Sequence, residues 1–223
     1  MFHFKIFIPN SLFIITITSF FISFVFSLQI VKEFLYLDTT QLVGSILSIS
    51  FTRELSPVLT SIVIIGRVGS LFTSQLAYML ATEQIDALLV LGINPINYLI
   101  IPRILSMLFG LPLLNIVSIV TSLISGSFVC FILYGIHPSI FFKSVAYNCF
   151  LVDFLKSLLK TTVFALFVSI TSCVWGITSK GGSSGVGLST TSSIVVCLLL
   201  VFILNFVLSY LLFDTSVSSF TFS

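Results

Sequence analysis

The sequence predicts an all-α integral membrane protein, with about five transmembrane helices and one short helix at the membrane surface. Of its 223 residues, 57% are hydrophobic and only 7% are charged, and the mean hydropathy is +1.25. A soluble domain carries roughly 25% charged residues, so this chain could not cover a water-facing surface. The few charges are separated by long uncharged runs, and these runs set the number of spans.

The composition also excludes several kinds of partner and chemistry. The net charge of +2 comes without a basic run, so no nucleic-acid partner is expected. The 25 phenylalanines suit an A+T-rich genome such as that of an organelle. No two of the cysteines form a C-x-x-C pair, and we interpret all four as small packing residues. They are Cys130, Cys149, Cys173 and Cys197.

The first span is expected near residues 11–30. No charge falls between Lys5 and Lys32, a run of 26 residues. At ~1.5 Å per residue such a run exceeds the ~30 Å hydrocarbon core. The alternative is a cleaved signal peptide, with an apolar region of about 7–15 residues and an A-x-A-like site. The longer run without such a site favours a span.

The second apolar stretch, residues 41–79, is interrupted by three charged residues. These are Arg53, Glu54 and Arg67. Either a re-entrant or interfacial piece ends near Pro57 and a span follows, or one long helix is kinked at this proline. We expect a span centred on residues 56–78.

Residues 82–92, TEQIDALLVLG, predict a short amphipathic helix at a membrane surface. Thr82 can cap its start, and Glu83 and Asp86 suit the positive N-terminal end of a helix. Gly92 and the following Asn-Pro end it.

Three further spans are expected. Residues 104–142 carry no charge, and we expect one long span over 104–133, kinked at Pro112, followed by a surface segment. The fourth span is expected over 157–178, since the 19 residues from Thr161 to Ser179 are uncharged. After a glycine-rich turn, the fifth is expected over 189–213.

Motifs for catalysis are missing from the chain. No phosphate-binding loop of the form G-x-x-x-x-G-K-[ST] occurs, and Lys180 precedes the nearest glycine cluster instead of following it. His3 and His137 are isolated, so no metal site is expected. We therefore expect neither an enzyme nor a cofactor.

Charged and polar residues inside the spans are candidates for function. An ionisable group there costs at least ~2.5–3.5 kcal/mol, so it needs a partner or a watery cavity. Arg53 and Glu54 are about 100° apart on a helix, so each is expected to meet a neighbouring helix or subunit. Lys160 and Asn205 lie at matching depths of antiparallel spans, which suggests an ion–dipole contact. The alternative is that the charges snorkel to the interface.

Small residues recur every four positions in the second span, at Gly66, Ser70 and Ser74. Such a stripe lets helix backbones approach closely in lipid. Packing within the chain and a seam between subunits are equally consistent with it.

Two stretches are similar to signature segments of the MlaE permease family. Residues 53–103 contain RELSPVLTSIVIIGRVGS and ATEQIDALLVLGINPINYLIIPR, and the C-terminal part contains LKTTVFALFVSITSCVWGITSKGGSSGVG and NFVLSYLLF. The resemblance covers about residues 12–213. It implies the membrane subunit of a lipid-transporting ABC system, of the kind found in Gram-negative bacteria and in the chloroplast inner envelope.

The resemblance further implies a homodimer with two ATPase subunits and an MCE-domain lipid-binding partner. The segment 82–92 would be the coupling helix, with Glu83, Gln84 and Asp86 against the ATPase. The N-terminus would share that side, and the C-terminus would lie opposite. The lipid path implied by the family is expected to involve four residues. They are Arg53, Glu54, Lys160 and Asn205.

Three features depart from the family pattern. Asn205 stands where the family commonly has Asp, so a buried Lys–Asp pair would be lost. Leu188 and Ser192 stand where an Arg is common, and the region before the first span is short. These departures keep open a structural or assembly subunit without its own transport path. A secondary transporter is disfavoured because no internal repeat is seen. The expected location is a plastid membrane, in particular the inner envelope, with the bacterial inner membrane as the alternative.

Overall fold

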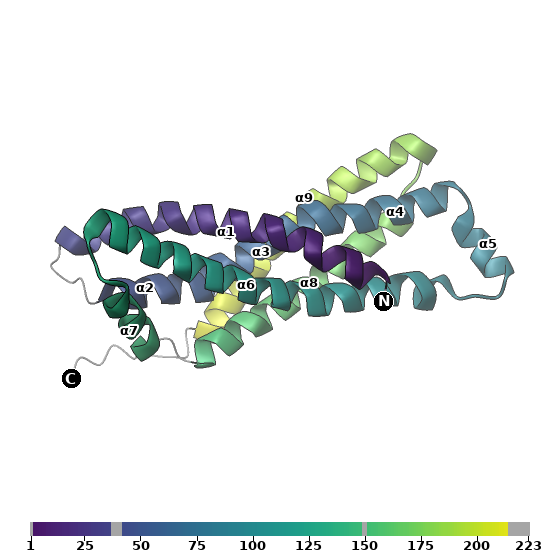
Figure 1. Ribbon diagram of the computed structural model, residues 1–223. Helices are drawn as coiled ribbons and strands as arrows, with labels where there is room; N and C mark the ends of the chain where they lie inside the picture. The colour runs from purple at the N-terminus through teal and green to yellow at the C-terminus, as the bar shows by residue number, and fades with distance from the viewer. Residues whose placement is uncertain (1, 37–41, 149–150, 214–223) are drawn as a thin grey trace.

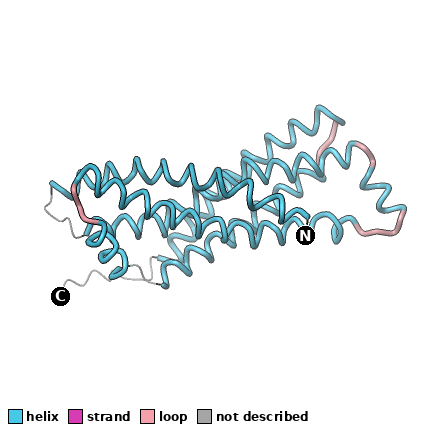
Figure 2. The backbone as a smooth tube through the Cα atoms, viewed as in Figure 1, coloured by secondary structure: helices cyan, strands magenta, loops and turns pink. Residues whose placement is uncertain are grey.

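A computed structural model describes residues 2–36, 42–148 and 151–213, and these residues form helices and short turns without strands (Figure 2). Five helices are long and apolar enough to cross a membrane. They are Ser11–Tyr36, Val43–Ala81, Ile96–Tyr134, Leu151–Ile177 and Ser184–Leu212. The prediction of an all-α protein with five spans is confirmed.

Helices α1 (Phe2–Tyr36) and α6 (Ile101–Tyr134) lie side by side and run in the same direction (Figure 1). The buried face of α1 carries serines spaced by four residues or, in one case, by eight. These are Ser11, Ser19, Ser23 and Ser27. Ser23 Oγ donates to the Ser122 carbonyl at 2.6 Å, and Ser125 Oγ donates to the Phe20 carbonyl at 2.9 Å. Small hydroxyl residues thus let the two helices approach closely and also bond them together.

The second spanning helix is continuous from Val43 to Ala81. It consists of five segments. They are α2 (Val43–Ser50), η2 (Phe51–Leu55), α3 (Ser56–Ile64), η3 (Ile65–Gly69) and α4 (Ser70–Ala81). The helix thus begins well before the expected span 56–78, and it takes the form of the single long helix considered as the alternative. Arg53 and Glu54 do not break it because both are paired inside the bundle.

The η segments are π-helical, and two of the three precede a proline. η2 ends two residues before Pro57, and η4 (Ile96–Ile100) ends two residues before Pro102. Proline has no N–H, so the carbonyl four residues earlier loses its α-helical donor. For Pro57 this is the Arg53 carbonyl, which accepts a bond from Lys160 Nζ at 3.1 Å instead. A side chain from another helix therefore compensates the proline.

Helix α5 (Gln84–Val90) lies between α4 and η4, within the expected segment 82–92. Thr82 does not cap it as expected, because its hydroxyl donates back to the Tyr78 carbonyl at 2.9 Å. Glu83 occupies the N-cap position instead, with a left-handed backbone (φ 56°). This conformation, rare for a residue with a side chain, turns the chain sharply out of α4.

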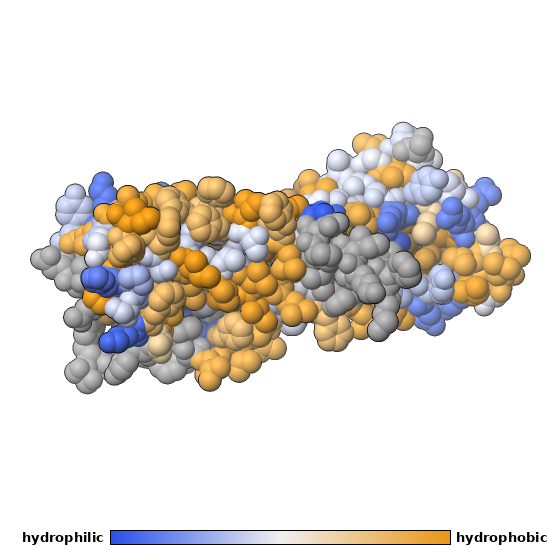
Figure 3. Space-filling model, viewed as in Figure 1, coloured by the Kyte–Doolittle hydropathy of each residue, from blue (hydrophilic) through white to orange (hydrophobic). Residues whose placement is uncertain are grey.

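The surface segment expected after the third span is α7 (Pro138–Asn148). It follows a glycine turn at Gly135 (φ 66°), where the Gly135 and Ile136 amides bond the last carbonyls of α6. Helices α8 (Leu151–Ile177) and α9 (Gly182–Phe213) complete the bundle. Helix α5 lies at one end of the bundle, and α7 and the end of α9 lie at the other (Figure 1). Apolar side chains cover the middle of the visible face, and hydrophilic ones gather toward both ends (Figure 3).

Helices α4 and α8 approach each other closely at Gly176. A Cβ added there would lie 2.7 Å from Leu76 Cβ and 3.1 Å from the Thr73 carbonyl oxygen. The Thr73 hydroxyl bonds the neighbouring helices at this level, with Ser193 Oγ at 2.9 Å and the Ser172 carbonyl at 3.0 Å. A side chain at position 176 would therefore push α8 away from α4.

We predict that Gly176→Ala lowers the unfolding free energy by about 1–3 kcal/mol, the usual cost of overpacking a tight core. Gly187→Ala is the matched control, because an added Cβ there meets nothing within 4 Å. Thermal unfolding of the two variants in the same detergent measures the difference. Equal stability of both variants would contradict the close α4–α8 contact.

Candidate functional site

A network of charged and polar side chains joins η2, α8 and α9 inside the bundle. Its centre is Lys160 on α8, whose side chain has no exposed area. The ammonium group contacts Glu54 Oε2 at 3.0 Å, Ser209 Oγ at 2.7 Å and the Arg53 carbonyl at 3.1 Å. One buried cation thus holds three segments together.

Glu54 is the acceptor of this network. Besides Lys160, it accepts bonds from Asn205 Nδ2 at 3.1 Å and from Ser209 Oγ at 2.8 Å. The direct contact expected between Lys160 and Asn205 is not among the bonds observed, and both side chains meet on Glu54 Oε2 instead. The departure at Asn205 therefore leaves Lys160 paired, because Glu54 supplies the carboxylate.

Arg53 points to a different partner, as its angular separation from Glu54 requires. Its Nη2 donates to Asp153 Oδ2 on α8 at 2.8 Å. Sequence reasoning did not single out Asp153 as a site residue. It precedes Lys160 by seven residues, which is two helical turns, and this spacing places both on one face of α8.

A layer of uncharged polar groups lies next to the ion pairs. Ser56 Oγ donates to Asn115 Oδ1 at 2.7 Å, and Asn115 Nδ2 donates to Ser157 Oγ at 3.0 Å. All three residues are buried. This chain of bonds links α3, α6 and α8 at the level of the network.

The network lies toward the end of the bundle that is opposite α5. Glu54 precedes the end of α4, Ala81, by 27 residues. At ~1.5 Å per residue this separation is about 40 Å along the helix. The charge network and the short helix α5 are therefore separate features, far apart along the bundle.

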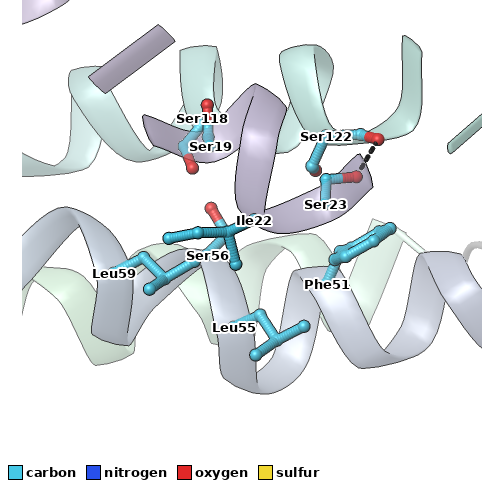
Figure 4. Close-up of a pocket in the computed structure, with 9 residues that line it drawn as sticks. All are labelled: Ser19, Ile22, Ser23, Phe51, Leu55, Ser56, Leu59, Ser118 and Ser122. Atoms are coloured by element: carbon cyan, nitrogen blue, oxygen red, sulfur yellow. Dashed lines mark hydrogen bonds between the residues drawn. The ribbon is translucent and has the colours of Figure 1, made fainter. Parts of the chain in front are cut away.

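A small cavity lies beside the network, between α1, η2–α3 and α6 (Figure 4). Serines and apolar side chains surround it, among them Leu55 and Leu59. Its accessible volume of about 10 Å³ is roughly that of a single water molecule. This cavity is therefore too small for a lipid.

The small-residue stripe of the second span faces outward at its first member. Gly66 is exposed, and a Cβ built on it meets no atom within 4 Å. The hydroxyls of Ser70 and Ser74 bond carbonyls of their own helix, Gly66 and Leu71. Within the described chain, the stripe is therefore a partly exposed surface without bulky side chains, and no other helix packs closely against Gly66.

Helix α5 combines exposed acidic and apolar side chains. Glu83, Gln84 and Asp86 are exposed at its start, and Val90 is 89% exposed near its end. A cavity of about 270 Å³ lies between α5, the end of α4 and η4, and its lining includes Tyr98. An apolar surface of this kind in a helix outside the bundle is typical of a protein contact.

A second buried cation lies near α5 and was missed by sequence reasoning. Arg103 is 1% exposed, and its guanidinium donates to the Phe72 carbonyl and to Gln75 Oε1, each at 3.3 Å. It also stacks over the Phe72 ring, with 5.6 Å to the centroid. Arg103 thereby connects the start of α6, which follows α5 in the sequence, to α4, which precedes it.

The cysteines show no sign of redox or metal chemistry in the part of the chain that is described. Cys130, Cys173 and Cys197 are free and buried, and Cys149 lies outside the described residues. Among residues 2–36, 42–148 and 151–213, no group of three or more His, Cys, Asp or Glu could hold a metal ion.

Comparison with known proteins gives one consistent result. The family description "Permease MlaE" matches residues 1–211. A "Probable ABC transporter permease protein ycf63" of Pyropia yezoensis is 50% identical over 95% of this chain and 80% of its own length. A Synechocystis protein, "Probable ABC transporter permease protein slr1045", is 44% identical over 92% and 78%. "Protein TRIGALACTOSYLDIACYLGLYCEROL 1, chloroplastic" of Arabidopsis thaliana is 40% identical over 92% of this chain and 59% of its own length.

The Lys160–Glu54 pair yields an asymmetric prediction. Glu54→Met leaves a buried ammonium without its carboxylate, and we expect a loss of about 3–5 kcal/mol in unfolding free energy. Lys160→Met leaves Glu54, whose side chain is 43% exposed, so the loss should be clearly smaller. The double variant should recover most of the Glu54→Met loss. Chemical denaturation in detergent tests this cycle, and equal losses in the single variants would contradict the burial difference.

Proposed function

The chain belongs to the MlaE permease family, the membrane subunits of lipid-moving ABC transporters, and from this premise we propose how its parts serve transport. ATP hydrolysis takes place on a separate ATPase subunit, and this chain forms the membrane path for a glycerolipid. The observation that carries the proposal is the family match over residues 1–211. The separation of α5 from the charge network supports a division into an ATPase end and a lipid end.

Helix α5 is the coupling helix in this proposal. It stands outside the five spanning helices, and it offers exposed carboxylates at Glu83 and Asp86 beside exposed apolar side chains. A partner with a basic rim and an apolar groove would complement both features. Gln84, also exposed at the first turn, would contact the same partner.

The lipid path in this proposal passes the charge network. Arg53 and Glu54 are its partly exposed members, with 28% and 43% of their side chains accessible. Lys160 is fully buried, so it would hold Glu54 in place rather than contact the headgroup itself. Asn205 would share this role through its bond to Glu54. An MCE-domain protein would receive or deliver the lipid at this end.

A homodimer is also part of the proposal. The exposed stripe of Gly66, Ser70 and Ser74 has no bulky side chain, and its hydroxyls are satisfied within the helix. A second copy of the helix could therefore approach closely without leaving a polar group unbonded. The small cavity inside one chain also favours a lipid path between two chains.

The proposed location is a plastid membrane, specifically the inner envelope. One relative supports the plastid: the Arabidopsis protein is named as chloroplastic, and its match covers 92% of this chain. The Phe-rich composition, with 25 copies, fits an organelle genome.

The double variant Glu83→Lys, Asp86→Lys tests the coupling role. Reversing both charges should repel a basic ATPase groove, and we expect ATP-dependent lipid transfer by the reconstituted complex to fall at least about tenfold. Lys143→Glu on α7, at the other end of the bundle, is the control, and it should leave copurification of the ATPase with this chain unchanged, whereas the double variant should reduce it. Full coupling of ATP hydrolysis to transfer in the double variant would refute the assignment of α5.

The variant Gly66→Leu tests the dimer seam. A leucine should hold the two helices apart, and we expect the dimer fraction to fall about tenfold, as for the loss of roughly 1.4 kcal/mol of association free energy. Gly187→Leu is the control, because it adds the same side chain to an exposed glycine of α9. Mass measurement of the particles in lipid nanodiscs reads the oligomeric state. A dimer fraction unchanged by Gly66→Leu would place the seam elsewhere.

A further inference from the structure

The groups of the charge network differ in how far a lipid headgroup could reach them. The Lys160 side chain has no exposed area, and Asp153 is 7% exposed. Glu54 and Arg53 are the accessible pair. A headgroup at this surface therefore meets one carboxylate and one guanidinium, while the other two charges act from behind.

The formal charges of the network cancel. Lys160 is matched by Glu54 at 3.0 Å, and Arg53 is matched by Asp153 at 2.8 Å. With Asn205 uncharged, these four ionised groups sum to zero. An anionic headgroup would find each cation already beside a carboxylate, so the Coulomb attraction to it is small.

Two acceptors at the site, the Glu54 carboxylate and Asn205 Oδ1, are not fully matched by donors of the described chain. A carboxylate offers about four lone-pair positions, and three donors reach Glu54. These are Lys160 Nζ, Asn205 Nδ2 and Ser209 Oγ. The Oδ1 atom of Asn205 is buried and has no hydrogen-bond partner within the described chain. A buried acceptor without a donor is destabilising, and an incoming donor would remove this cost.

We propose that this site selects lipids whose headgroup carries O–H or N–H donors and no net negative charge. The shared chemistry has two sources, the hydroxyls of a neutral glycolipid and the ammonium of an ethanolamine headgroup. Both can donate to Glu54 and, after a small movement of α9, to Asn205 Oδ1. A choline headgroup has the same net charge as ethanolamine but no N–H donor, and phosphatidic acid carries net negative charge. The inference rests on the proposed function, since it assumes that a headgroup meets this site.

The test compares four lipids that have identical acyl chains. In each lipid, one acyl chain carries the reporter group. They are phosphatidylethanolamine, phosphatidylcholine, monogalactosyldiacylglycerol and phosphatidic acid. The complex with its ATPase is reconstituted into phosphatidylcholine vesicles that contain one reporter lipid at a time. We expect ATP-dependent transfer of the ethanolamine lipid and the galactolipid to be about tenfold faster than that of the other two, the effect of one charge-assisted bond.

Native mass spectrometry measures how much of each lipid binds to the purified chain. This measurement separates the headgroup preference from the proposed transport function. If no lipid is moved, the proposed function fails, and the order of binding still decides the inference. If phosphatidic acid or the choline lipid is bound or moved as well as the ethanolamine lipid, the inference is overturned.

Two variants test the acceptors on Glu54 and at position 205. Glu54→Gln removes the negative charge but keeps one carbonyl acceptor, so preference for ethanolamine should fall more than preference for the galactolipid. Glu33→Gln, at an exposed position on α1, is the control and should change neither. Asn205→Asp adds a carboxylate of the same shape, and it should raise the ethanolamine preference over phosphatidic acid several-fold. This gain cannot arise from misfolding, and its absence would overturn the role of Glu54 and Asn205.

Discussion

The bundle is organised around one energetic constraint, the burial of the Lys160 ammonium group. A charge at this depth is costly unless it is paired and fully hydrogen-bonded. Lys160 meets this condition only when η2, α8 and α9 are together, because each of its three described acceptors is on η2 or α9. The pairing therefore favours the correctly assembled bundle. If α9 were displaced, Lys160 would lose its bond to Ser209, and if η2 were displaced, it would lose its bond to Glu54.

The constraint also explains the irregular backbone of the second spanning helix. Pro57 deprives the Arg53 carbonyl of an α-helical donor, and η2 is wound as a π-helix just before it. Lys160 bonds both this carbonyl and the adjacent carboxylate. The proline and the lysine are thus two parts of one arrangement, in which a backbone defect provides an acceptor for a buried charge.

Much of the architecture could be read from the spacing of the charges. Uncharged runs give the five spans, and residues 82–92 give the short helix because acidic residues precede its apolar end. The start of the second helix could not be found in this way, since Arg53 and Glu54 look like a boundary until their partners on α8 are known. The serines of α1 were not singled out from the sequence, and only their bonds to α6 show that they form a packing face.

The functional site was predictable in part. The sequence pointed to Arg53, Glu54, Lys160 and Asn205 because polar groups in apolar spans need partners. It could not rank the possible pairs, and a lysine opposite an asparagine suggested a direct bond that the structure replaces with two bonds to Glu54. Arg103 escaped notice because it lies near a span end, where an arginine usually reaches water. Its contacts with Phe72 and Gln75 of α4 appear only in the folded bundle.

Arg103 has a mechanical consequence for helix α5. Its bond to Gln75 joins two positions that are 28 residues apart, so the segment between them is a closed loop with α5 at its far end. A loop fastened at its base cannot tilt about one leg alone. A force on α5 is therefore passed to both α4 and α6, the two helices that Gln75 and Arg103 connect at the base of the loop.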